Sequence, residues 1–213
     1  GIDRIRYMTS YPSQVNQDLI DAHRDIEKLM PFIHLPIQSG SDKILKAMNR
    51  KYTVSQYMDV VEKLRKSRPD IAISSDFIVG FAGETEEDFL KTLELTKKVS
   101  FATSFSFKYS IRPGTAGAKM PNQIDEKIKS ERLDILQEEL ERQQENFNKL
   151  HENSALEVLI ESKSDRNDGT WFGKSPYLQT VVANSKNNEN LRGKIKKVKI
   201  NKTNRKLLEG EVL

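Results

Sequence analysis

The hydrophobic positions of the first 150 residues alternate between the two-residue period of strands and the 3.6-residue period of helices. Strand-like segments lie at residues 4–12, 32–38, 71–81 and 104–110. Helical segments cover about residues 16–29, 42–48 and 125–151, and others begin at residues 53 and 85. These are four consecutive βα units, which predict a parallel sheet with helices on its faces. Because an eight-unit barrel needs about 250 residues, we expect only part of a (β/α) barrel.

Two helix starts carry a threonine at the cap position, and the first of them has the spacing of a capping box. Thr53 is followed three residues later by Gln56, and Thr85 is followed at the same spacing by Asp88. In a capping box, the hydroxyl of the cap residue accepts a hydrogen bond from the backbone N–H three residues later. The side chain of that later residue accepts one from the backbone N–H of the cap residue. The two helices are therefore expected to begin directly after these threonines.

The hydrophobic pattern changes after residue 151. Short strand-like segments appear at residues 155–162, 177–183, 194–202 and 207–213, with turn sequences such as DRNDGTWFG between them. Four or five short strands in about 60 residues predict a small antiparallel β-barrel of the OB-like kind. We therefore divide the chain into residues 1–150, ending in a long linking helix, and residues 151–213.

Composition narrows the class of protein. Charged residues make up 31% and hydrophobic residues 36% of the chain, and no apolar run approaches the roughly 18 residues of a membrane span. We therefore expect no membrane partner. The chain has no cysteine, which excludes disulfides and thiolate metal sites within it and is compatible with a cytoplasmic location.

The net charge of +4 is unevenly distributed, because residues 1–150 are neutral and residues 151–213 hold the whole basic excess. A local excess of this kind suggests a polyanionic partner, but lysines that guard the edge of a solvated sheet would produce it equally well. The aromatic residues near this region could stack on RNA bases or could form the core of the barrel. The candidate RNA-binding residues are Lys174, Lys194, Lys196, Lys197, Lys199, Lys202 and Arg205.

Small and polar residues follow the second predicted strand. Gln38 and Ser39 lie at its end, Gly40 permits a tight turn, and Ser41 can cap the next helix. Ligands of α/β proteins bind at the carboxyl ends of strands, so this turn is a candidate site. A routine βα turn with a helix cap remains the alternative.

The third predicted strand ends in a second polar cluster. Asp76 interrupts an apolar run, and a carboxylate there needs a partner or a ligand. Gly80 keeps the strand end open, and Glu84 precedes the Thr85 cap, where it could instead complement the helix dipole. Arg112 lies in a turn after the fourth strand and could bind a carboxylate or phosphate, or pair with a helix carboxylate.

Histidines offer no metal site in the sequence. His34 lies in a strand and His23 in a helix, and neither has a second histidine or a carboxylate at the spacing of metal ligands. We therefore expect structural roles for both side chains, and we assign no catalytic or metal-binding residue in this chain.

Four segments together resemble one enzyme family. RIRYMTSYP, FIHLPIQSGSDKILKAMNRKYT, ISSDFIVGFAGETEEDF and YSIRPGTAGA are similar to segments of the radical S-adenosylmethionine methylthiotransferases. The resemblance favours the branch that acts on N6-isopentenyladenosine in tRNA. It extends to the end of the chain, where residues 151–213 resemble the TRAM domain, an OB-like RNA-binding module.

The resemblance implies a cytoplasmic enzyme with a defined chemistry. A 4Fe–4S cluster on a CxxxCxxC loop cleaves S-adenosylmethionine, and the resulting radical abstracts hydrogen from C2 of the adenine at position 37 of tRNA. A second 4Fe–4S cluster supplies sulfur, and another S-adenosylmethionine supplies the methyl group. Carried onto this sequence, Gln38 and Ser39 correspond to the region near the cofactor's ribose, and the stretch from Asp76 to Glu84 corresponds to the region beside its adenine.

The cysteine count sets this chain apart from the complete family pattern. Thiolates hold iron–sulfur clusters, and the chain has none. We therefore expect the chain to be the C-terminal portion of such an enzyme, inactive alone, with the missing N-terminal half as a partner. The alternative is an RNA-binding module that acts without catalysis.

Overall fold

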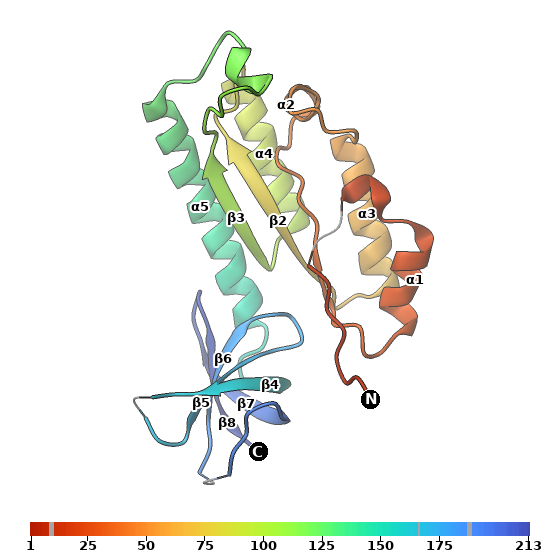
Figure 1. Cartoon of the computed structure of the whole chain (residues 1–213), viewed down its shortest axis with the longest axis vertical. Helices are drawn as coiled ribbons and strands as arrows, with labels where there is room; N and C mark the ends of the chain where they lie inside the picture. Colours follow the sequence, from red (N-terminus) through yellow and green to blue (C-terminus); the bar gives the residue numbers. More distant parts are fainter. Residues whose placement is uncertain (9–10, 166, 187–188) are drawn as a thin grey trace.

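The chain folds into an α/β part and a β-barrel that are joined by one long helix (Figure 1). The structure, a computed structural model, describes residues 1–8, 11–165, 167–186 and 189–213. Within them, three parallel strands form a sheet in the order β1, β2, β3. The strands are β1 (Phe32–His34), β2 (Ala72–Val79) and β3 (Thr103–Lys108).

Helices cover one face of this sheet. Phe77 and Val79 of β2 are fully buried and pack in one core with Tyr57, Phe89 and other helix side chains. On the opposite face, Phe105 and Phe107 of β3 are more than half exposed. The α-helices are α1 (Gln17–Asp25), α2 (Asp42–Ala47), α3 (Val54–Ser67), α4 (Glu86–Val99) and α5 (Glu126–Lys149), and the short 3-10 helices are η1 (Pro12–Gln14) and η2 (Gly117–Lys119).

The strand predicted over residues 4–12 is wrong over its described part. Residues 4–8 contain only one isolated parallel bridge, between Ile5 and Leu29, and Thr9 and Ser10 lie outside the described residues. The bridge rests on two hydrogen bonds, from Ile5 N to Lys28 O at 2.7 Å and from Met30 N to Ile5 O at 3.0 Å. The alternating pattern in this segment therefore reflects side chains that contact different parts of the protein, not strand pairing.

Both predicted threonine caps are present, and each is part of a complete capping box. The Thr53 side chain accepts a hydrogen bond from Gln56 N and the Gln56 side chain accepts one from Thr53 N, which starts α3. Thr85 and Asp88 make the same exchange at the start of α4. Local sequence alone therefore sets the beginning of these two helices.

The C-terminal part is a closed barrel with the strand order β4, β5, β6, β8, β7. Four of its five pairings are antiparallel, and β6 pairs with β8 in parallel. The segment DRNDGTWFG, predicted as a turn, contains the start of β5, because a buried Trp171 needs a strand to place it in the core. The strands are β4 (Ala155–Lys163), β5 (Thr170–Lys174), β6 (Thr180–Asn184), β7 (Ile195–Thr203) and β8 (Leu208–Val212).

The barrel core settles the role of one aromatic residue. Trp171 is 5% exposed and packs with the buried Val158, Ile160 and Val198, whereas Phe172 on the opposite face of β5 is 38% exposed. Among the described helices, none is long and apolar enough to cross a membrane.

Candidate functional site

A cavity of about 670 Å³ lies at the carboxyl ends of the strands. Its walls come from the end of β2, the end of β3, the turn after β1, and the loop that carries η2. Three predicted site residues line it together: Gln38, Asp76 and Arg112. The size and the few convergent polar groups are typical of a small-molecule site.

Gln38 reaches the cavity through an unusual backbone conformation. Its φ is +78°, in the left-handed region that residues other than glycine rarely adopt. Gln38 N donates to Asp76 O at 2.9 Å, and Gln38 O accepts from Ile78 N at 2.9 Å. These two bonds anchor the turn beside β2 and keep the Gln38 side chain, which is 6% exposed, at the cavity wall.

Asp76 has a partner that the sequence did not predict. His34 Nε2 lies 3.4 Å from Asp76 Oδ2, and His34 Nδ1 lies 2.7 Å from Ser74 Oγ. The three side chains lie on the same face of the sheet, opposite Phe77 and Val79, because His34 of β1 pairs with Ser74 of β2. Residues in adjacent strands are remote in sequence, so spacing alone could not reveal that His34 orients a cavity carboxylate.

The Ser39 side chain is turned away from the cavity. It is fully buried, and its Oγ lies 3.4 Å from Thr92 Oγ1 of α4. The Gly40 N–H donates to the same Thr92 oxygen at 2.9 Å. A Cβ at Gly40 would lie 2.4 Å from the carbonyl oxygen of Lys91, so glycine is required for the turn to contact the helix.

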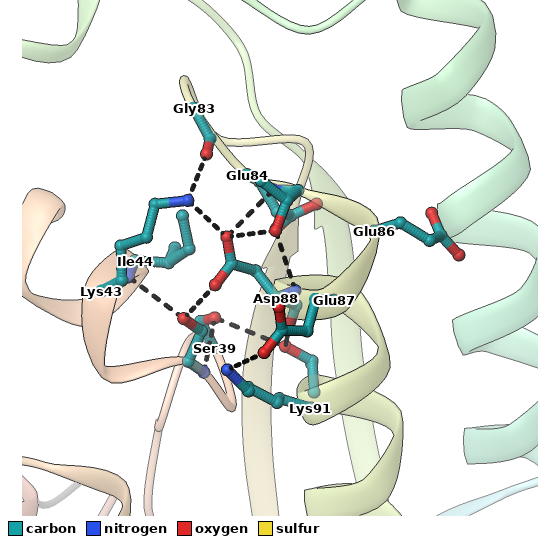
Figure 2. A network of polar contacts seen from close by, with 12 residues as sticks. Ser39, Lys43, Ile44, Gly83, Glu84, Glu86, Glu87, Asp88 and Lys91 are labelled. Carbon is teal, nitrogen blue, oxygen red and sulfur yellow. Dashed lines mark hydrogen bonds and ion pairs between the residues drawn. The ribbon is translucent and has the colours of Figure 1, made fainter.

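A polar network centred on Asp88 joins the two polar turns, as Figure 2 shows. Ser41 Oγ donates to Asp88 Oδ1 at 2.7 Å, and Lys43 Nζ donates to Asp88 Oδ2 at 2.7 Å. Thr85 donates to Oδ2 through both its backbone N–H and its hydroxyl. Burial alone would raise the pKa of Asp88, but the bonds from Lys43, Thr85 and Ser41 outweigh it and hold this pKa well below its ordinary value.

Glu84 and Gly80 form a second network, which faces α5 and not the cavity. Glu84 Oε1 accepts from Gly80 N at 2.8 Å and from Arg132 Nη1 at 2.8 Å. Burial raises the pKa of Glu84, and the two donors oppose that rise. Gly80 has a φ of +73°, and a Cβ there would lie 2.3 Å from Lys129 Cγ. These contacts satisfy the Glu84 carboxylate without any ligand.

The candidate RNA-binding residues separate into paired and unpaired groups. Lys196 lies 2.7 Å and Lys194 lies 3.8 Å from a carboxylate oxygen of Glu189. Arg205 pairs with Glu141 of α5, and Lys174 donates to Thr180 Oγ1 at 2.9 Å. The remaining three are exposed and have no ion pair among the described residues: Lys197, Lys199 and Lys202.

Asp88 is the residue whose importance the sequence understated. The capping box predicted its local bonds to Thr85, but its bonds to Ser41 and Lys43 cross more than 40 residues. Among the described residues no cluster of three or more histidine, aspartate or glutamate side chains could hold a metal ion.

Two family models match separate parts of the chain. Residues 2–96 match the model of the Radical SAM superfamily, and residues 149–213 match that of the TRAM domain. The chain therefore combines a radical SAM region with a TRAM domain. A solved structure has a similar fold: coproporphyrinogen III oxidase (HemN) from Escherichia coli, a radical SAM enzyme, has a TM-score of 0.54 and 17% identity, over 66% of this chain and 32% of HemN.

Curated relatives indicate a more specific group of enzymes. The chain is 52% identical over 212 residues to the tRNA-2-methylthio-N(6)-dimethylallyladenosine synthase of Ehrlichia canis, and 51% identical over 213 residues to that of Rickettsia felis. Each match covers 100% of this chain, but only 48% and 47% of the respective relative. The resemblance to the radical S-adenosylmethionine methylthiotransferases is confirmed, and the chain spans about half the length of the curated relatives it matches.

We predict that Asp88→Asn lowers the free energy of unfolding by about 2 kcal/mol at pH 7, because it weakens several charge-assisted hydrogen bonds to a buried carboxylate. The folded-state pKa is depressed, so the ionised carboxylate stabilises the fold above the unfolded-state pKa of about 4. That contribution declines progressively as the pH falls below about 4 toward the lower folded-state pKa, so the difference between the two proteins should narrow by pH 3. The measurement is urea unfolding of both proteins between pH 7 and pH 3.

The matched control is Glu87→Gln, because Glu87 is 79% exposed and, within the described part of the chain, its one ion pair is with Lys91, one turn along α4. We expect a change of less than about 0.5 kcal/mol from it. If the gap between wild type and Asp88→Asn stayed constant down to pH 3, the role given to the Asp88 charge would be wrong.

Proposed function

We propose that this chain is part of a tRNA methylthiotransferase that converts N6-isopentenyladenosine at position 37 of tRNA to its 2-methylthio derivative. The single observation that carries the proposal is the identity of 51–52% over the whole chain to synthases named for this product. The proposal also rests on a cavity at the strand ends and on a TRAM domain that offers exposed lysines. A cytoplasmic location follows from an enzyme that modifies tRNA.

The cavity suits part of a bound S-adenosylmethionine. Asp76 can accept hydrogen bonds from hydroxyl or ammonium groups, Gln38 can donate and accept, and the Arg112 guanidinium can bind a carboxylate. All three line the same cavity, whereas Ser39, Gly80 and Glu84 would support its walls from behind. When bound, S-adenosylmethionine would supply the radical and the methyl group.

The residues of this chain do not fit an iron–sulfur cluster. The family's two 4Fe–4S clusters need thiolate ligands, and the sequence contains no cysteine. In the proposed complete enzyme, the thiolates come from residues outside this sequence, in the half that we expect as a partner. We therefore propose that the 213 residues alone do not catalyse the reaction.

The barrel is proposed to bind the tRNA. Lys197, Lys199 and Lys202 are exposed on β7. Phosphate groups could bind these ammonium groups without breaking an ion pair of the described residues. The paired candidates, Lys174, Lys194, Lys196 and Arg205, could join only by exchanging their present partners. RNA binding without catalysis is the second candidate function, favoured by the absence of cysteine.

We predict that Asp76→Asn weakens S-adenosylmethionine binding about tenfold, because it replaces charge-assisted hydrogen bonds by neutral ones. Isothermal titration calorimetry with the 213-residue chain measures the affinity for S-adenosylmethionine. Asp59→Asn, an exposed position on α3, is the matched control. If wild type binds and Asp76→Asn binds equally well, Asp76 is not a cofactor ligand.

An activity assay of the chain alone tests whether catalysis requires residues outside this sequence. After anaerobic reconstitution with iron and sulfide, we expect no cluster absorbance, and we expect tRNA incubated with S-adenosylmethionine and reductant to gain no methylthio group by mass spectrometry. A complete relative serves as the positive control. Modification by the unaided chain would overturn the proposed inactivity.

We predict that the triple change of Lys196, Lys197 and Lys199 to Glu weakens tRNA binding by more than tenfold at low salt, because the changes replace attraction to phosphates by repulsion. The control reverses three exposed lysines of the α/β part: Lys63, Lys66 and Lys98. Filter binding at several salt concentrations measures both. Equal losses in the two variants would show that net charge, not the barrel surface, determines binding.

A further inference from the structure

One loop of the barrel, residues 175–179 between β5 and β6, docks the barrel onto the α/β part; we call it the docking loop. The N-terminal segment grips it from one side. Arg6 Nη2 donates to the carbonyl oxygens of Ser175 and Pro176 at 3.2 and 3.1 Å. Arg4 donates to the carbonyl oxygen of Lys174 at 3.3 Å and to that of Glu157 at 2.8 Å.

The end of α5 grips the barrel from the other side. Asn148 is 2% exposed, and its Nδ2 donates to the carbonyl oxygens of Asn204 and Arg205 at 2.7 and 3.1 Å. Its Oδ1 accepts from Gln179 Nε2 of the docking loop at 2.8 Å. One buried amide therefore joins α5, the docking loop and the turn between β7 and β8.

Aromatic side chains fill the space between these two grips. Tyr177 of the docking loop stacks on His151 with ring centroids 4.8 Å apart and meets Phe147 of α5 edge-on at 5.8 Å. Both Phe147 and Tyr177 pack against a small buried cluster that contains Phe32 at the start of β1. The Arg6 guanidinium lies 5.6 Å from the centre of the Phe32 ring, so the same arginine contacts both parts of the protein.

Backbone carbonyls are fixed acceptors, and four arginine bonds to them define an orientation as well as an attachment. That orientation matters because the cavity and the barrel lie at opposite ends of α5. Lys108, which lines the cavity, pairs with Glu126 at the start of the helix, and Asn148 holds the barrel at its end. The helix rises about 33 Å from Glu126 to Asn148, so a rotation of about 10° at the junction would displace a bound RNA by about 6 Å.

We propose that Arg4, Arg6 and Asn148 are positioning residues, which hold the TRAM barrel so that its exposed lysines and the cavity contact one RNA molecule at the same time. The inference rests on the proposed function, because it takes tRNA as the molecule that spans both ends. A rigid junction gives the second contact a high effective concentration, and a loose junction lowers it. We call Arg4, Arg6 and Asn148 the clamp. Loss of the clamp should therefore weaken the binding of long RNA and leave the binding of short RNA unchanged.

The test compares two RNAs on the full 213-residue chain by fluorescence anisotropy. Arg4→Ala/Arg6→Ala should bind tRNA about tenfold more weakly than wild type and bind a short single-stranded oligonucleotide, which reaches only the barrel, within twofold of wild type. Arg24→Ala/Lys63→Ala removes two positive charges from exposed positions of α1 and α3 and controls for charge. Asn148→Ala, which changes no charge, should reproduce the selective loss.

A distance measurement keeps the proposal separate from the proposed function. The chain has no cysteine, so Glu62→Cys on α3 and Asp168→Cys on the barrel allow specific spin labelling. We expect one narrow distance distribution, which broadens in Arg4→Ala/Arg6→Ala. Failure of wild type to bind tRNA would refute the proposed function, and an unchanged distribution would refute the clamp. The positioning role would be refuted if the variants lost the same affinity for both RNAs, or if they lost affinity for neither RNA.

Discussion

The carboxylate of Asp88 is the constraint on which the rest of the α/β part depends. It receives hydrogen bonds from its own helix cap, Thr85, and from the turn after β1 through Ser41 and Lys43. The second contact of that turn, between Gly40 and Thr92, is possible only because glycine has no side chain. Gln38 directly precedes this turn, so the buried Asp88 on α4 helps the backbone bonds to β2 to hold a cavity residue in place.

The predictability of this structure follows the range of the interactions involved. The helix starts at Thr53 and Thr85 were predictable, because a capping box is contained within four residues. The segment around Ile5 was not, because its alternating residues serve a bridge and an arginine clamp that lie far away in sequence. The start of β5 was missed because turn-forming residues precede Trp171, and only burial in the barrel core makes this segment a strand.

The same distinction applies to the candidate site. Gln38, Asp76 and Arg112 were identified from their places after predicted strands, and parallel pairing brings them to one cavity. Sequence position could not show that Glu84 turns toward Arg132 or that His34 reaches Asp76, since each pair joins different elements. Polar residues at strand ends thus divide into those that face the cavity and those that brace it, and only the three-dimensional packing assigns them.

The two parts of the chain differ in how far their proposed roles depend on residues outside them. The barrel closes on its own core and carries exposed cations, so its proposed role requires nothing beyond its own strands. The sheet leaves Phe105 and Phe107 uncovered on the face that also bears Asp76, and its cavity has polar groups but no thiolate. In the proposed enzyme the cavity would be one part of the reaction site and the barrel would bind the RNA. The junction between them is then important, because it sets the orientation of the barrel relative to the cavity. Arg6 illustrates the point: one guanidinium contacts both the sheet and the barrel, and neither part alone explains its position.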